Sequence, residues 1–350
     1  MRTALTDLVG VRHPVVQTGM GWVAGPRLVS ATAEAGGLGI LASATMTYDE
    51  LAAAIKETRS RTENPFGVNL RADAEDAARR VDLLITEGVK VASFALAPRR
   101  ELITKLKDHG VVVVPSVGAT RHAEKVAAWG ADAVVVQGGE GGGHTGGVAT
   151  TLLLPAVLDA IDIPVVAAGG FFDGRGLAAA LAYGAAGIAM GTRFLLTRES
   201  TVPDAVKQLY LDHDLAGTVV TRKVDGVAHR VLRTELVDAL EKSGPLAGFA
   251  RAAGNAARFR RSSGLSWAAL VREGLRLRTS GRTRAQVLMA ANTPMLLRAG
   301  LVDGDPAAGV LASGQVVGLL HDLPSVADLI GGIVADAEAI LRRLGDGGCA

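Results

Sequence analysis

The chain has one cysteine, Cys349, and aromatic residues make up only 4% of its 350 residues. A single cysteine cannot form an internal disulfide, which excludes a disulfide-stabilised scaffold. No run of 18 apolar residues is free of charge, and the N-terminal stretch lacks an apolar segment of signal-peptide length. We therefore expect no transmembrane helix and a cytoplasmic location. An apolar fraction of 49% indicates a globular protein and excludes a disordered one.

Positive charge is concentrated in one part of the chain. The net charge is +2, but residues 245–300 hold ten arginines, no lysine and one acidic residue, so this window carries +9 and the remainder −7. Such a patch favours a polyphosphate ligand, a nucleic acid, an acidic partner or a membrane surface. Aromatic residues that could stack on bases are sparse there, so nucleic acid is not expected.

The first 195 residues alternate short apolar runs with alanine-rich helical stretches, at a mean spacing of about 25 residues. The runs begin near residues 15, 38, 66, 91, 111, 133, 164 and 187. Eight such units predict an α/β fold of the (β/α)8 TIM barrel type. A doubly wound sheet, which needs five or six strands, is the alternative.

The alternation stops after Leu195. Residues 200–300 read as helices and loops, with a short strand pair near Val219-Val220 and Val231-Leu232, and residues 323–344 read as a terminal helix. We predict a barrel made of residues 1–197 and 305–350. A mainly helical, arginine-rich insertion over 198–304, after strand eight, would form a substrate or lid region at the barrel mouth.

A glycine-rich stretch, QGGEGGGHTG, follows the sixth predicted strand from Gln137 to Gly146. Dense glycine lets a backbone approach a ligand and presents N–H groups to anions; the alternative is a flexible loop. Within it, His144 is a candidate general acid or base, or else a structural histidine. The other six histidines read as surface residues: His13, His109, His122, His213, His229 and His321.

Other candidates follow predicted strands. Gly169-Gly170 and Gly191-Thr192 come after the seventh and eighth strands, where barrels bind phosphate. The turn Gln17 to Gly21 and Asn69 end the first and third strands and would point into the mouth. No metal-ligand spacing, nucleophile elbow or Walker sequence is present, so no metal site is expected and cofactor chemistry is favoured.

These motifs together resemble the nitronate monooxygenase family of flavin-dependent barrels, which includes the FMN-dependent enoyl-acyl-carrier-protein reductases. The stretch from Gln137 to Gly146 is the most specific feature, and the resemblance extends to Gly314-Gln315. It implies one bound FMN, with His144 as the catalytic histidine. The residues implied to bind FMN are Gln17, Thr18, Gly19, Met20, Gly21, Asn69, Gln137, Gly142, Gly143, Gly169, Gly170, Gly191, Thr192 and Gln315.

More closely, the chain resembles an actinobacterial branch of the family that acts on CoA thioesters of steroid-ring remnants. The matching blocks are residues 15–26, 169–176 and 290–295. The resemblance implies that a hydroxy-methyl-oxo-indane carboxyl-CoA is desaturated or reduced by hydride transfer through flavin N5, with NAD(P) as co-substrate. The alternative is oxidation of nitronates with O₂.

Arginine is the side chain best shaped to grip the phosphates of CoA. The candidates for this role are Arg258, Arg260, Arg261, Arg272 and Arg276. A solvated basic helix face is the alternative interpretation. Barrels with a helical insertion often dimerise, so a homodimer is a further expectation. The reaction direction and the choice between NADH and NADPH are left open.

Overall fold

Eight parallel strands close into a barrel in the computed structural model, which describes residues 1–95, 98–242 and 284–347. β1 pairs with both β2 and β9, so the sheet has no free edge. The predicted TIM barrel is confirmed, and the doubly wound alternative is excluded. The barrel strands are β1 (Val15–Gln17), β2 (Leu38–Ala42), β3 (Phe66–Leu70), β4 (Val91–Phe94), β5 (Val112–Val117), β6 (Val134–Gln137), β8 (Val165–Ala168) and β9 (Gly187–Met190).

The strands are apolar throughout because both of their faces are buried. Val135 and Val166 belong to a cluster of alternating strand residues that fills the barrel interior. Their neighbours Val134, Val136 and Val165 belong to a second cluster, which includes residues of the surrounding helices. Each strand therefore packs on side chains in both directions, which a run of valines satisfies.

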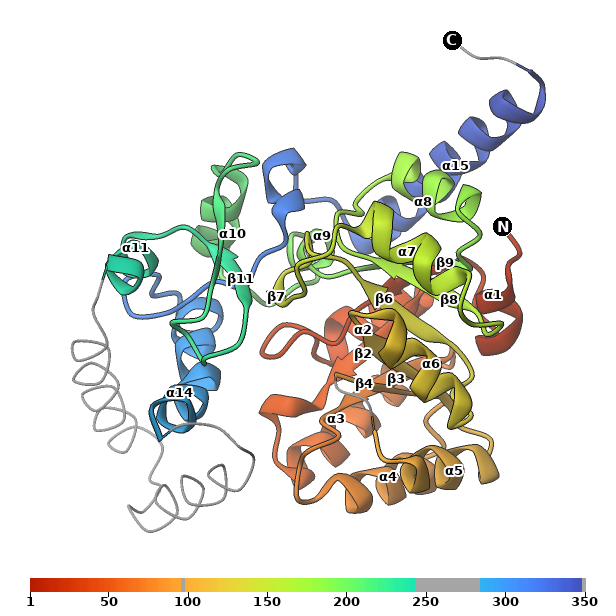
Figure 1. Cartoon of the computed structure of the whole chain (residues 1–350), viewed down its shortest axis with the longest axis horizontal. Helices are drawn as coiled ribbons and strands as arrows, with labels where there is room; N and C mark the ends of the chain where they lie inside the picture. The colour runs from red at the N-terminus through yellow and green to blue at the C-terminus, as the bar shows by residue number, and fades with distance from the viewer. Residues whose placement is uncertain (96–97, 243–283, 348–350) are drawn as a thin grey trace.

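Helices surround the barrel (Figure 1). Those that precede or follow its strands are α1 (Ala4–Val9), α2 (Pro26–Glu34), α3 (Tyr48–Arg61), α4 (Ala77–Thr86), α5 (Arg100–Asp108), α6 (Thr120–Ala128), α7 (Thr150–Leu158), α8 (Gly174–Ala182) and α9 (Thr192–Leu195). Thr47 caps α3 in a capping box with Glu50, and Asp173 caps α8. The predicted terminal helix is α15 (Val326–Gly345), which packs against α8 and α2 and so completes the ring.

Described elements between α9 and η3 form the lobe drawn at the left of Figure 1. Its described elements are α10 (Asp204–Leu211), β10 (Thr218–Thr221), β11 (His229–Leu232), α11 (Glu235–Lys242) and α14 (Arg284–Leu301), followed by η3 (Gln315–Leu319). β10 and β11 pair antiparallel, which confirms the predicted strand pair. The boundaries 198 and 304 of the insertion stay a prediction. Tyr210 and Leu232, which lie within it, share a buried cluster with barrel residues.

A two-residue strand that the sequence did not predict joins the barrel to this lobe. β7 (Gly143–His144), inside the glycine-rich stretch, pairs antiparallel with β11 and makes a three-stranded sheet with order β10-β11-β7. Figure 1 shows β7 between the barrel and the left-hand lobe. Within the described ranges, no helix has the length and apolar character needed to span a membrane.

Gly174 lies where α8 crosses α15 at close range. A Cβ added there would lie 2.4 Å from Asp336 Cβ and 2.6 Å from the Ala337 nitrogen, whereas one at Gly331, also on α15, would meet nothing within 4 Å. We expect Gly174→Ala to lower the free energy of unfolding by about 1–3 kcal/mol through overpacking. Gly331→Ala should raise it by about 0.5–1 kcal/mol, since alanine is the better helix former. Urea unfolding of both variants measures this, and equal effects would contradict the close crossing.

Candidate active site

The candidate residues gather at the end of the barrel where its parallel strands finish. Gln17 and Gln137 are the last residues of β1 and β6, and Asn69 lies near the end of β3. The glycine pair 169–170 and the pair 191–192 follow β8 and β9 directly. In barrels of this type, the chemistry takes place at this end.

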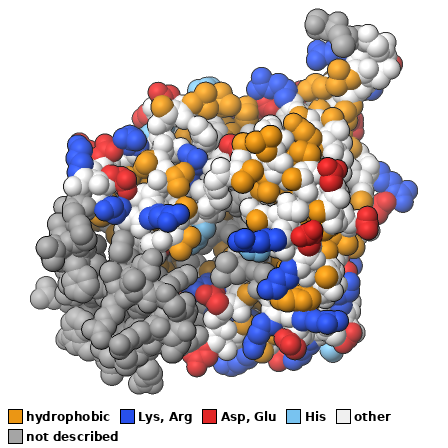
Figure 2. All heavy atoms as spheres, in the orientation of Figure 1, with side chains coloured by type: hydrophobic (Ala, Val, Ile, Leu, Met, Phe, Trp, Pro, Cys, Tyr) orange, Lys and Arg blue, Asp and Glu red, His pale blue; other side chains and the backbone are white. Residues whose placement is uncertain are grey.

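A cleft also lies at the opposite end of the barrel from these residues. This cleft of about 410 Å³ is lined by residues that precede and begin β3 and β4, among them Thr62, Phe66 and Lys90. Those are the amino ends of the strands, where residues serve stability rather than chemistry. Figure 2 shows histidine atoms, in pale blue, beside the hollow between the barrel and the left-hand lobe. We therefore place the site at the mouth.

Hydrogen bonds hold the glycine-rich stretch in place. The Glu140 carboxylate accepts hydrogen bonds from the Thr150 N–H, at 3.1 and 3.0 Å, and from the Thr150 hydroxyl, at 2.7 Å. Arg230 donates to the Gly139 carbonyl at 2.9 and 3.2 Å. Gln137 Nε2 donates to the His144 carbonyl at 2.8 Å. This bonding does not fit a flexible loop.

Several glycines of the stretch are explained by neighbouring protein atoms. A Cβ at Gly138 would lie 2.0 Å from Thr150 Oγ1, and one at Gly142 would lie 2.5 Å from the Gly314 nitrogen. The sequence suggested that glycine here admits a ligand. At these two positions it admits the protein's own chain, and contact of Gly142 and Gly143 with FMN stays a prediction.

Segments distant in sequence meet around Glu140. The Gly314 N–H donates to Thr192 Oγ1 at 2.8 Å, and the Gln315 N–H donates to the Glu140 carbonyl at 2.9 Å. A Cβ at Gly170, whose φ is +83°, would lie 3.7 Å from Glu140 Cβ. The structure thus brings Gly170, Thr192 and Gln315 close together. All three are predicted to bind FMN, and that role stays a prediction.

The turn after β1 approaches β3 and β9. The Thr18 N–H donates to the Met190 carbonyl at 3.1 Å. A Cβ at Gly19 would lie 2.5 Å from Asn69 Cβ, and one at Gly191 would lie 3.4 Å from Met20 Sδ. Thr18, Gly19, Met20, Asn69 and Gly191 therefore form one group. Gly21 lies further along the turn, facing Thr45.

Gln17 is fully buried, with an unpaired oxygen. Its Nε2 donates to the carbonyls of Thr18 and Ile40. Its Oε1 has no hydrogen-bond partner among the residues that the structure describes. A buried amide oxygen without a partner costs free energy, so Gln17 Oε1 is an acceptor that no described residue satisfies.

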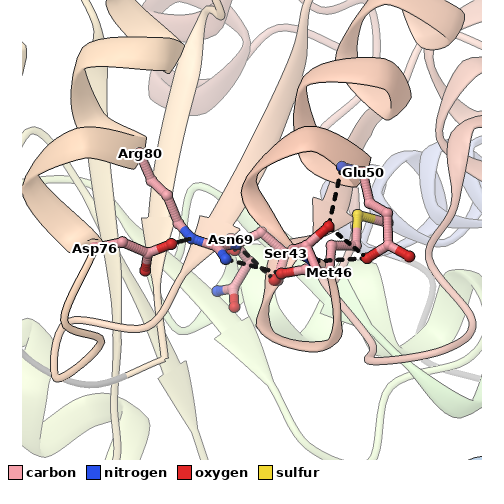
Figure 3. Close-up of polar contacts among 7 residues, drawn as sticks. Ser43, Met46, Glu50, Asn69, Asp76 and Arg80 are labelled. Atoms are coloured by element: carbon pink, nitrogen blue, oxygen red, sulfur yellow. Dashed lines mark hydrogen bonds and ion pairs between the residues drawn. The ribbon is translucent and has the colours of Figure 1, made fainter. Parts of the chain in front are cut away.

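Arg80, which the sequence did not single out, fixes the loop beside Asn69 (Figure 3). Its guanidinium donates to Asp76 at 2.8 Å and to the carbonyls of Ser43 and Met46 at 2.9 and 2.8 Å. Ser43 Oγ then donates to the Asn69 carbonyl at 2.7 Å. The Arg80 side chain is 11% exposed.

Trp22 links the barrel to the segment after β9. Its φ is +66°, in the left-handed region that a bulky residue rarely adopts. Its indole N–H donates to the Pro294 carbonyl of α14 at 2.8 Å, and the Arg298 guanidinium lies 5.5 Å from the ring. This strained turn follows directly on the candidate group Gln17 to Gly21.

His144 is paired with a buried aspartate from the β10–β11 connection. His144 Nε2 lies 2.5 Å from Asp225 Oδ2, and the His144 ring centroid lies 4.7 Å from that of His229. The His144 side chain is 59% exposed, whereas Asp225 and His229 are 6% and 3% exposed. The interpretation of His229 as a surface residue is wrong, because β7 and the Asp225 turn cover it.

The surroundings of Asp225 keep it ionised. Burial alone would raise the pKa of Asp225, but the hydrogen bond from His144, the nearby His229 imidazole and the Val227 N–H outweigh it. Together they hold that pKa well below the ordinary value for aspartate. Asp225 is therefore a carboxylate whenever His144 is in place.

His144, Asp225 and His229 also present three atoms of metal-ligating type within 4.8 Å of one another. The sequence gave no sign of this cluster, because His144 is 81 residues from Asp225. The expectation of no metal site stays a prediction. The five candidate CoA-binding arginines, Arg258 to Arg276, lie outside the described residues.

The fold and the mouth define a TIM-barrel enzyme. The family model described as nitronate monooxygenase matches residues 2–80 and 74–336. The chain belongs to the nitronate monooxygenase family and is an oxidoreductase, and the resemblance is confirmed. Membership supports an FMN-type flavin as cofactor.

Two relatives match nearly the whole chain. Proteins from Rhodococcus jostii and Mycobacterium tuberculosis are 70% and 69% identical to it over 346 residues, covering 99% and 98% of this chain and 98% of each relative. Both are named (3aS,4S,5R,7aS)-5-hydroxy-7a-methyl-1-oxo-octahydro-1H-indene-4-carboxyl-CoA dehydrogenase.

Solved structures agree with the fold. FabK from Thermotoga maritima has a TM-score of 0.83 and 33% identity, covering 99% of this chain and 100% of its own. A nitroalkane oxidase from Streptomyces ansochromogenes has a TM-score of 0.76 and 30% identity, covering 98% and 100%.

Arg80→Met tests the network beside Asn69. The change leaves the Ser43 and Met46 carbonyls without their donor, so we expect the free energy of unfolding to fall by about 1–3 kcal/mol. The matched control is Arg61→Met, because Arg61 makes an exposed i,i+4 pair with Glu57; it should change stability by no more than about 0.5 kcal/mol. Urea unfolding measures both, and a neutral Arg80 variant would show that the network is not needed.

Proposed function

We propose that this chain is an FMN-dependent dehydrogenase of a steroid-ring CoA thioester, a hydroxy-methyl-oxo-indane carboxyl-CoA, with NAD(P) as co-substrate. The observation that carries the proposal is the 70% identity to a relative of that name over 99% of the chain. A probable nitronate monooxygenase from Staphylococcus saprophyticus is only 30% identical and matches 68% of the chain. The higher sequence identity over a greater share of the chain favours a thioester substrate over a nitronate.

The residues at the mouth fit an FMN group. The amides of Gln17, Asn69 and Gln137 supply both donors and acceptors, as the edge of a flavin ring requires, and no described residue satisfies the buried Gln17 oxygen. Backbone at Gly169, Gly170, Gly191 and Thr192 would hold the phosphate, with Gln315 beside it. Thr18, Gly19, Met20 and Gly21 would line the ring.

His144 would handle the substrate's proton. A bound flavin supplies the acceptor for the hydride that leaves the β-carbon, and NAD(P) would exchange that hydride as co-substrate. His144 would take the proton from the α-carbon, where the thioester carbonyl makes the C–H bond acidic, as the electron pair forms the C=C bond. In the opposite direction, His144 would return the proton.

The arginine-rich window supports a CoA substrate through its charge. The pyrophosphate and 3′-phosphate of CoA suit Arg258, Arg260, Arg261, Arg272 and Arg276, since guanidinium groups bind phosphate oxygens in pairs. A small nitronate needs no such patch. A homodimer and a cytoplasmic location remain part of the proposal.

We expect His144→Ala to lower kcat with the acyl-CoA by about 10²–10⁴-fold, the usual contribution of general acid–base catalysis. Flavin content should stay unchanged, because the ring is exposed and its contacts are with Asp225 and His229. His122→Ala, an exposed residue on α6, is the matched control. Absorbance of the purified variants and steady-state rates measure this; loss of flavin together with rate would make His144 structural.

Anaerobic spectra identify the substrate class. NADH, the indane carboxyl-CoA and a nitronate are added separately to the purified protein. We expect the acyl-CoA or NADH to bleach the flavin absorbance and the nitronate to leave it unchanged. Rapid reaction with the nitronate alone would instead support the second candidate, nitronate oxidation, which the family description and the nitroalkane oxidase structure favour.

A further inference from the structure

The β10–β11 connection completes the acid–base group of the barrel. We infer that Asp225 is a positioning residue for His144: it accepts the hydrogen bond from Nε2–H and leaves Nδ1 as the nitrogen that exchanges a proton with the substrate. The inference deepens the proposed function and rests on it for the identity of that substrate.

Backbone pairing fixes the place of His144. His144 lies opposite His229, and Gly143 lies opposite Arg230, in the antiparallel register of β7 and β11. The Thr145 N–H continues the pairing by donating to the Ala228 carbonyl at 3.1 Å. The imidazole is therefore carried by a strand that is bonded to the segment holding Asp225.

Asp225 is held in a tight turn. Its Oδ1 accepts the Val227 N–H at 3.0 Å, and the Gly226 N–H donates to the Arg222 carbonyl at 2.9 Å. Gly226 has a φ of +84°, which glycine adopts without strain. The carboxylate is thus fixed before it meets His144, and its Oδ2 remains for the imidazole.

The pairing decides which nitrogen of His144 carries the proton. An ionised carboxylate only accepts hydrogen bonds, so Nε2 must be the donor across the 2.5 Å contact. In the neutral imidazole Nδ1 is then the basic nitrogen. Among the described residues, Nδ1 has no hydrogen-bond partner, and the ring is 59% exposed.

His229 closes the other side of the carboxylate. Its Nδ1 lies 3.7 Å from the same Asp225 Oδ2, too far for a hydrogen bond, and its ring lies against that of His144. His229 and Asp225 are 3% and 6% exposed, so the carboxylate end of the Asp225–His144 bond is sheltered from water. A shielded charge-assisted bond is stronger than an exposed one.

Asp225→Asn is the test, because it keeps the size of the side chain and removes its charge. We expect kcat with the acyl-CoA to fall by about 10²-fold or more, since the fixed tautomer is lost, while KM and flavin content stay close to those of the wild type. The matched control is Asp238→Asn, on α11, where the carboxylate makes an exposed ion pair with Arg233. It should keep full activity.

The tautomer itself is read by nitrogen-15 NMR of histidine-labelled protein at alkaline pH, with the His144 signals assigned by their loss in His144→Ala. We expect protonated Nε2 in the wild type and a mixture of tautomers in Asp225→Asn. This readout needs no substrate. If the wild type ignores the acyl-CoA but shows the Nε2–H form, the proposed substrate fails and the positioning role stands.

Three results would overturn the positioning role. They are protonated Nδ1 in the wild type, unchanged kcat in Asp225→Asn, and one equivalent of zinc in the purified protein that the Asp225 variant loses. The last result would make His144, Asp225 and His229 a metal site instead.

Discussion

The pairing of β7 with β11 is the interaction on which the arrangement of the mouth depends. It involves only two residues of the glycine-rich stretch, but these bring His144 next to Asp225 and His229. Arg230, the neighbour of His229 on β11, reinforces the pairing through the Gly139 carbonyl. Without this short sheet, the histidine would be attached only to the loop after β6 and would lack its carboxylate.

The glycines of the glycine-rich stretch allow it to pack closely against other parts of the protein. Its glycines let the chain pass within van der Waals distance of Thr150 and Gly314. That close packing lets the Glu140 carboxylate bind the start of α7 and the Glu140 carbonyl bind the start of η3. A larger residue at Gly138 or Gly142 would clash with these neighbours, so the loop would lose its shape even without a ligand.

The barrel was predictable because its determinants are local. Buried parallel strands are apolar along their whole length, and helices are followed by glycines with positive φ at Gly36, Gly88, Gly110, Gly130 and Gly184. Local capping also marks where helices begin, as the Thr47 side chain does at α3.

The missed residues depend on distant partners. β7 is too short to show a period, and it becomes a strand only because β11 pairs with it. Asp225 and Arg80 look like ordinary surface charges in sequence, since their importance comes from partners on other elements. His229 comes just before the predicted strand residues Val231-Leu232, but its burial depends on β7, which is distant in sequence. The candidate glycines and amides were found because they follow strands that were themselves predictable.

The position of α15 has a consequence for how the chain folds. This helix fills the gap between α8 and α2, and β9 closes the sheet against β1. Both contacts join segments far apart in sequence, and contacts of this kind slow folding. During synthesis, the apolar faces of α2 and α8 stay uncovered until residues 326–345 have left the ribosome. The growing chain therefore exposes apolar surface between α2 and α8 until α15 is synthesised, and exposed surface of this kind favours aggregation before folding is complete.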